Sequence, residues 1–209
     1  MKAYQRLILF LFISLNINFS FAENRLPTIN SDHYSQEQQE AQKIFENARK
    51  TKIFGPFEPL LYSPQLMNEA RSMGDYLRYH SAIGNTLSEL TILVTSRFWT
   101  QDYEWYVHAP IALKKGISAS TIEAIRQGQI PTNMNTEEQL VYQFTVELLN
   151  NKQVSNTTYS AIEKHFGKKG AVDLAGIVGY YSFLALEMNM AQYPLPKDGV
   201  SLPRFPENR

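Results

Sequence analysis

The sequence predicts an all-α protein, because apolar residues recur at helical spacing along nearly the whole chain and no segment alternates as a strand would. Capping residues and glycine stops punctuate this pattern at regular intervals. None of the 209 residues is a cysteine, so disulfides and thiolate metal sites cannot support the fold. Packing between helices, of which we expect about eight, must hold the chain together.

Capping signals mark where the helices begin. Ser35 and Gln38 form a capping box, and Ser63 followed by Pro64 supplies an N-cap and a proline at the first helical position. Glycine stops and apolar spacing complete the pattern. The predicted helices lie at residues 35–50, from 63 past 77, from 86 past 94, and at 101–115, 118–127, 136–150, 155–166 and 169–191. The proline-rich tail from Tyr193 onward is expected to be irregular.

The N-terminal segment is typical of an export signal. Lys2 and Arg6 precede an apolar run that ends in small residues, as a cleavage site requires. The run is shorter than the ~20 residues needed to span a bilayer. We therefore expect residues 1–22 to be removed, so that a single domain of residues 23–209 begins at Glu23 and is exported to the periplasm. An uncleaved membrane anchor is the alternative.

The charge balance of the expected mature chain excludes one class of partner. Removing the two basic residues of the signal leaves 20 acidic residues against 18 basic ones, a net charge of about −2. A domain with this charge gives no reason to expect a nucleic acid partner. We expect a small-molecule substrate instead.

The last predicted helix carries no charged residue between Leu174 and Leu186. A segment that is apolar all round must be surrounded by protein or lipid. These 13 residues are too few to cross a membrane. We expect burial at the centre of the fold or of a homo-oligomer, and no stable membrane anchor.

Three residues form the candidate catalytic site. Glu104 and His108 are four residues apart and so share a helical face, and Glu89 lies on the preceding helix. A straight helix would separate Glu89 from His108 by ~28 Å, but a break near Trp99, with Thr100 as the new N-cap, would bring them together. Glu89 would then accept a hydrogen bond from one His108 nitrogen, while the other nitrogen faces the substrate beside Glu104.

Several motifs of the chain form one set. They are Gly55-Pro56, Ser63-Pro64, Ser88-Glu89-Leu90, Tyr103-Glu104-Trp105 with His108, Lys115-Gly116-Ile117-Ser118 and the small and apolar residues after Val172. Together they resemble the carboxymuconolactone decarboxylase-like family of the alkylhydroperoxidase-D superfamily. The likeness covers roughly residues 50 to 196, and its most specific part is Tyr-Glu-Trp-x-x-His. The resemblance implies an all-α, alkylhydroperoxidase-D-like, oligomeric fold.

The resemblance also implies which chemistry is absent. Redox members of the superfamily carry a Cys-x-x-Cys pair twelve residues after a glutamate and just before a histidine. Counting from Glu89 places Gln101 and Glu104 at those cysteine positions. Without a thiolate the chain cannot reduce peroxide as a thiol peroxidase does. The decarboxylase side of the family remains, in which a small, acidic, ring-containing substrate loses carbon dioxide without a cofactor.

Three further residues are candidates for substrate binding. Arg97 could hold a substrate carboxylate in a fork, although a surface arginine is the alternative. Trp105 could be a pocket wall that raises the pKa of Glu104 by desolvation, although a core aromatic residue is the simpler alternative. Asn189 lies near the end of the last helix, where related proteins place a polar residue near the pocket.

Other interpretations of the three catalytic candidates stay open. Glu89 could pair with Thr86 as a capping-box residue only, and Glu104 with His108 could be an exposed surface pair. All three could instead hold a divalent metal ion. The protein could also be a non-catalytic exported binding or assembly protein. Export counts against the usual catabolic decarboxylase, whose pathway is expected in the cytoplasm.

Overall fold

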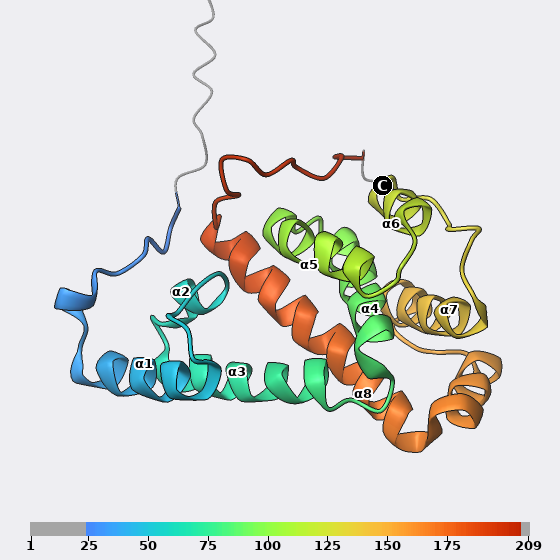
Figure 1. The fold of residues 1–209 in the computed structure, drawn as a ribbon, viewed down its shortest axis with the longest axis horizontal. Coiled ribbons are helices and arrows are strands. Elements are labelled where there is room, and N and C mark those ends of the chain that lie inside the picture. Colours follow the sequence, from blue (N-terminus) through green and yellow to red (C-terminus); the bar gives the residue numbers. More distant parts are fainter. Residues whose placement is uncertain (1–23, 206–209) are drawn as a thin grey trace, which may run out of the picture.

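The computed structural model describes residues 24–205, and in this range it contains eight α-helices, one short 3-10 turn at Ser31–His33 and no strand (Figure 1). The predicted signal peptide lies outside the described residues. The all-α prediction is confirmed. The helices are α1 (Gln36–Arg49), α2 (Phe57–Leu60), α3 (Pro64–Tyr79), α4 (Gly84–Phe98), α5 (Asp102–Lys114), α6 (Ala119–Arg126), α7 (Thr136–Asn151) and α8 (Asn156–Ala191).

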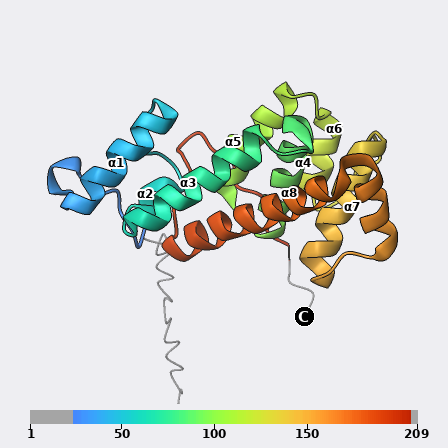
Figure 2. The ribbon, with the colours of Figure 1, turned by 90° about the horizontal axis from the view of Figure 1, so that it is seen from below.

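Helices α4 and α8 form the centre of the fold. Helix α4 packs against α5, α7 and α8, while α3 runs alongside α8 and carries α1 on its other side (Figure 2). Ten consecutive residues of α4, from Leu87 to Ser96, are buried. Such burial on every face explains why the α4 sequence shows little amphipathic pattern. A glutamate inside this segment is therefore forced into the protein interior.

Helix α8 joins two predicted helices across a glycine. The expected helices at 155–166 and 169–191 form one continuous element that is interrupted at Gly167, whose φ of 67° and ψ of 175° are non-helical. By length and composition α8 could cross a membrane, but 56% of its most apolar window is buried inside the protein. The uncharged stretch is buried on one side only, because Gly179 and Leu186 are exposed. The expectation of burial all round was therefore wrong for the single chain.

The turn between α4 and α5 is the predicted break, although its cap differs from the prediction. The side chain of Gln101, and not that of Thr100, accepts a hydrogen bond from the backbone N–H of Tyr103 at 2.6 Å. Thr100 has a positive φ of 49°, which lies outside the extended region typical of an N-cap. Helix α4 also begins before Thr86, whose hydroxyl donates to the carbonyl of Lys115. The capping-box interpretation of Glu89 is therefore wrong.

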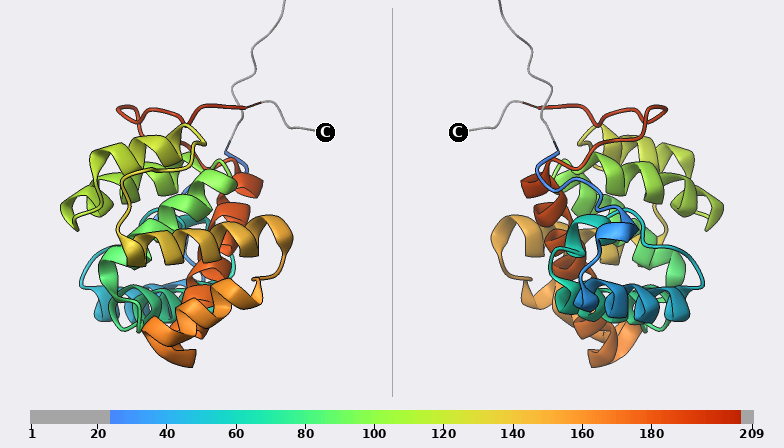
Figure 3. Two further views of the ribbon diagram at one scale, coloured as in Figure 1. Left: turned by 90° about the vertical axis from the view of Figure 1, so that its right-hand side faces the viewer. Right: turned by 90° about the vertical axis from the view of Figure 1, so that its left-hand side faces the viewer.

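The C-terminal tail is irregular, as predicted, and lies over the end of the molecule that carries α5 and α6 (Figure 3). Asp102, the first residue of α5, accepts a hydrogen bond from the backbone N–H of Leu202 at 2.9 Å. The same carboxylate forms an ion pair with Arg204 at 2.6 Å. The tail is thereby fastened to the N-terminus of the helix that carries Glu104 and His108.

Candidate active site

The structure brings the three catalytic candidates into contact. His108 Nδ1 lies 2.6 Å from Glu89 Oε2, and His108 Nε2 lies 3.3 Å from Glu104 Oε2. The Glu89 carboxylate comes from the middle of α4, and the other two side chains come from successive turns of α5. The imidazole is therefore held between two carboxylates, one on each ring nitrogen.

All three side chains are buried. Glu104 and His108 are each only 3% exposed, and Glu89 is 4% exposed. The interpretation of Glu104 and His108 as an exposed surface pair is therefore wrong. Burying charged groups costs free energy unless they are paired. Placing this cluster in the protein interior therefore carries a considerable desolvation cost.

The electrostatic environment favours a positively charged imidazole. Burial alone lowers the pKa of His108, but hydrogen bonds and charge interactions with Glu104 and Glu89 outweigh it, so that the pKa lies above its usual value. Each ring nitrogen then carries a proton and donates to one carboxylate. The Tyr181 ring, nearly perpendicular to the imidazole with the two centroids 5.2 Å apart, closes a further side of the cluster.

The same arrangement argues against a metal ion held by the three side chains. A metal site requires its ligand atoms to converge on one point, whereas the two carboxylates face opposite nitrogens of the imidazole. Across residues 24–205, no group of three or more acidic or histidine side chains is arranged to hold a metal ion.

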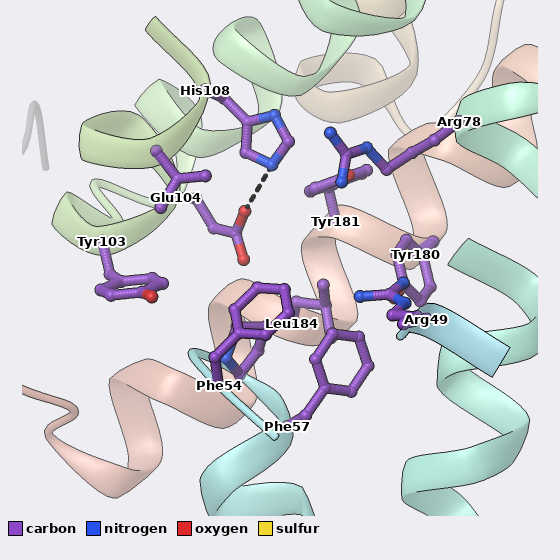
Figure 4. A pocket seen from close by; sticks show the side chains of 12 residues that line it. Arg49, Phe54, Phe57, Arg78, Tyr103, Glu104, His108, Tyr180, Tyr181 and Leu184 are labelled. Carbon is purple, nitrogen blue, oxygen red and sulfur yellow. Dashed lines mark ion pairs between the residues drawn. The ribbon is translucent and has the colours of Figure 1, made fainter. Parts of the chain in front are cut away.

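A cavity of about 40 Å³ lies beside the cluster, large enough for one or two water molecules. The Glu104 carboxylate points into this space from one side, and Phe54, Phe57 and Leu184 bound it from another (Figure 4). Glu104 Oε1 is buried and has no hydrogen-bond partner within the described chain. This oxygen is therefore available to interact with a molecule in the cavity. The complete lining is Arg49, Phe54, Pro56, Phe57, Arg78, Tyr103, Glu104, Val107, His108, Tyr180, Tyr181 and Leu184.

The three predicted substrate-binding residues lie outside this cavity. The guanidinium of Arg97 stacks 4.4 Å from the ring centroid of Phe205 in the tail. Trp105 is buried in a hydrophobic cluster between α4 and α5, as a core aromatic residue would be. Asn189 accepts a hydrogen bond from Gln101 and donates one to the carbonyl of Trp99. These three side chains support the α4–α5 turn and its surroundings, and the structure does not bring them to Glu104.

Several lining residues were not predicted. Arg78 of α3 forms an ion pair with Glu89 at 3.4 Å, and Arg49 of α1 also reaches the cavity. Nothing in the periodicity of α1 or α3 distinguishes these arginines from surface residues. The Phe54-Gly-Pro-Phe57 segment did carry a signal, because two aromatic residues around a Gly-Pro turn are unusual in an exposed loop.

A second buried carboxyl group lies close to the cavity. Glu187 of α8 is 9% exposed, and both of its carboxyl oxygens lack a hydrogen-bond partner in the described range. Burial, with a smaller contribution from the charge of Glu104, raises the pKa of Glu187 to about 8. This carboxyl group is therefore mainly protonated at neutral pH.

Comparisons with known proteins identify the fold. No family model matches the chain, and no curated protein matches it. Two solved structures of uncharacterised peroxidase-related proteins resemble it at low identity. The protein from Ralstonia eutropha JMP134, described as an alkylhydroperoxidase AhpD core, has a TM-score of 0.67 at 13% identity over 85% of this chain and 95% of its own. The protein from Silicibacter sp. TM1040 has a TM-score of 0.63 at 12% identity over 80% of this chain and 87% of its own.

A third similar structure is that of the debrominase Bmp8, as a cysteine-to-alanine variant in complex with 2,3,4-tribromopyrrole. It has a TM-score of 0.64 at 13% identity over 85% of this chain and 94% of its own. Sequence identities this low establish a shared fold only. The protein therefore has the alkylhydroperoxidase-D-like fold, as its sequence motifs had indicated.

Proposed function

We propose that this protein is a cofactor-free acid/base enzyme of the decarboxylase or isomerase type, acting on a small carboxylated lactone or a similar carbon acid. The observation that carries the proposal is the free Oε1 of Glu104, buried and facing a cavity. A carboxylate in this position has no structural partner on that oxygen and is available for proton transfer. We further propose that the protein acts after export, in the periplasm.

Glu89, Glu104 and His108 would each have a separate role in catalysis. Glu89 accepts the proton of His108 Nδ1, which fixes the orientation of the ring. His108 Nε2 faces Glu104 and can pass a proton to it. In a decarboxylation the bond between the substrate carbon and its carboxylate breaks, carbon dioxide leaves, and the electron pair stays on carbon. Glu104, protonated by His108 Nε2, then delivers that proton to the carbon, and the neutral imidazole takes up a proton from solvent.

The same residues could also catalyse an isomerisation. The ionised Glu104 takes a proton from an acidic carbon and returns it to another position of the same substrate. Positioned acid/base groups of this kind typically accelerate a reaction by ~10²–10⁴. A substrate ring packed against the aromatic walls would displace water from the cavity and so strengthen each electrostatic interaction inside it.

The comparisons support a small ring-shaped ligand but not a peroxidase. The debrominase of similar fold was solved with a brominated pyrrole. Two neighbours are described as peroxidase-related, whereas the present chain has no cysteine and thus no thiolate to attack a peroxide. Acid/base chemistry needs only the groups that this chain retains.

A non-catalytic exported binding or assembly protein is the second candidate. The observation that favours it is the size of the cavity, because about 40 Å³ admits water but not a ring. A ring would enter only after side chains at the mouth move. Phe54, which lines the cavity and is 40% exposed, is placed to move in this way.

The test is turnover of a panel of carboxylated lactones, followed by NMR, with wild-type protein and two variants. Glu104→Gln should remove turnover and leave the fold intact, while Glu123→Gln, which changes an exposed glutamate, should leave turnover unchanged. His108→Gln is less suitable, because it would leave the buried Glu104 without its cation and Glu89 with Arg78 alone, and breaking a buried ion pair typically costs ~3–5 kcal/mol. Equal turnover by wild type and Glu104→Gln would contradict the proposal.

A further inference from the structure

The cavity beside Glu104 adjoins a larger groove on the surface. This outer groove has a volume of about 440 Å³ and lies between α1 and α3. Three residues line both spaces: Arg49, Phe54 and Arg78. These three form the threshold between the groove and the cavity. A molecule that reaches Glu104 from the groove must pass two guanidinium groups.

Both threshold arginines are held in place. Arg49 donates to Asp75 through Nε and Nη2, each at 2.9 Å, and its guanidinium lies 4.5 Å from the ring centroid of Phe57. Arg78 contacts Glu89 through Nη2 alone, at 3.4 Å, and its buried Nε has no partner in the described range. Arg78 is therefore a fixed cation with an unfilled hydrogen-bond donor.

The charges around the threshold do not cancel. Four cationic side chains, Arg49, Arg71, Arg78 and His108, share ion pairs with only three carboxylates. The carboxylates are those of Asp75, Glu89 and Glu104. The ion pairs form two separate groups: Arg49 and Arg71 share Asp75, which gives a net charge of +1, and Arg78 and His108 share Glu89 and Glu104, which gives zero when the imidazole is charged. The two groups meet at the threshold and together carry a net charge of +1. One bound monoanion would neutralise it.

The walls select for shape as well as charge. Phe54 and Phe57 contact each other at a centroid separation of 6.0 Å and stand on one side of the threshold. Tyr103 lines the inner cavity, where Figure 4 shows it on the same side as Glu104. Aromatic faces pack well against a flat ring. The guanidinium fork, in turn, matches a planar carboxylate.

We propose that the threshold is a carboxylate-binding subsite: Arg78, supported by Arg49, holds the single carboxylate of a flat-ring substrate and places its ring carbon toward Glu104. The inference rests on the proposed function and specifies the substrate as a monoanion. Arg78 would be a specificity-determining residue, since a neutral analogue leaves its Nε unpaired and a dianion exceeds the available charge. This subsite replaces the one that the sequence had suggested for Arg97.

The probes are 2-furoate, its neutral isostere 2-furamide and the dianion furan-2,5-dicarboxylate, each measured by titration calorimetry at fixed salt. Wild-type protein should bind 2-furoate roughly ten- to hundredfold more tightly than 2-furamide, the range expected for a hydrogen bond to a charged group. The dianion should bind less tightly than 2-furoate. Equal affinity for 2-furoate and 2-furamide, or no binding of 2-furoate at millimolar concentration, would overturn the proposal.

Variants assign the preference to the threshold. Arg78→Gln should abolish the preference for 2-furoate, and Arg78→Lys should restore part of it. The matched control is Arg71→Gln, which removes the same charge and a partner of Asp75 but does not line either space. A preference that survives Arg78→Gln, or that Arg71→Gln removes equally, would overturn the assignment. If Arg78→Gln does not fold, the wild-type comparison of the three probes still decides the substrate charge.

Binding and catalysis remain separable in this design. Glu104→Gln should still discriminate 2-furoate from 2-furamide, because the carboxylate subsite does not include Glu104. Discrimination without any turnover by wild-type protein would refute the proposed function and leave the subsite standing. Turnover by wild-type protein without discrimination between 2-furoate and 2-furamide would refute the subsite and leave the proposed function standing.

Discussion

Replacing Glu187 with glutamine should make the protein more stable at alkaline pH. Glu187 is buried on α8, one turn beyond the cavity residue Leu184, and its carboxyl oxygens have no hydrogen-bond partner in the described part of the protein. The folded state raises its pKa from 4.5 to about 8, chiefly through burial. Between these two values the folded protein keeps a proton that the unfolded chain releases. Stability must therefore fall as pH rises through this window.

The pKa values set the size of the effect. Each pKa unit corresponds to ~1.36 kcal/mol, so the interval from 4.5 to about 8 gives a ceiling of ~5 kcal/mol at pH 9. Residual solvent contact and relaxation around the charged carboxylate reduce this to ~2–3 kcal/mol. At pH 5 the same linkage contributes less than ~1 kcal/mol. Glutamine does not titrate, so the Glu187→Gln variant does not lose this part of its stability as pH rises.

Urea unfolding of wild type and Glu187→Gln at pH 5, 7 and 9 measures this directly. The free energy of unfolding of the variant should gain ~2 kcal/mol or more on that of wild type between pH 5 and pH 9. Glu123→Gln, at an exposed position, should show no such change and controls for general charge effects. A difference between Glu187→Gln and wild type that does not vary with pH would refute the assignment of a buried, protonated Glu187.

Three further outcomes follow from the sequence and the fold. Thiol-dependent peroxide reduction should be absent in a peroxide-consumption assay, because the chain contains no cysteine; measurable turnover by the unmodified protein would contradict this. The exported form should begin at Glu23, and the intact mass of periplasmic protein tests this, with a retained Lys2 indicating an anchor instead. We also propose a homo-oligomer that covers the apolar groove between α3 and α8, lined in part by Leu66, Met73 and Phe183. Light scattering should then give a mass well above the ~21 kDa of one chain, and a monomer at micromolar concentration would refute it.

Sequence reasoning located the α4–α5 break and all helices of the described chain except the single turn α2, with α8 expected in two parts, because these features depend on local signals. Capping residues, glycine stops and the four-residue spacing of Glu104 and His108 are signals that span only a few residues of the chain. The contact between Glu89 and His108 followed from the break together with the family resemblance. The cap itself was misassigned, because Thr100 and Gln101 are both plausible by residue type and only the backbone conformation distinguishes them.

The substrate-facing residues could not be predicted in the same way. Arg49 and Arg78 reach the cavity because α3 packs beside α8 and α1 packs on α3, a tertiary arrangement that no local pattern encodes. Arg97 was the nearest arginine in sequence to the break, but its helix face points to the tail and Phe205. Trp105 follows Glu104 directly and so projects from a different face of α5, into the core.

The central claim is that Glu104 exchanges a proton with a substrate carbon. Proton NMR in D₂O measures it most directly, by following the loss of the acidic ring C–H signal of a carboxylated butenolide as deuterium enters from solvent. Wild-type protein should accelerate this exchange over the uncatalysed rate, and Glu104→Gln should slow it by at least ~10² while still binding 2-furoate. Exchange at the wild-type rate in Glu104→Gln would contradict the account.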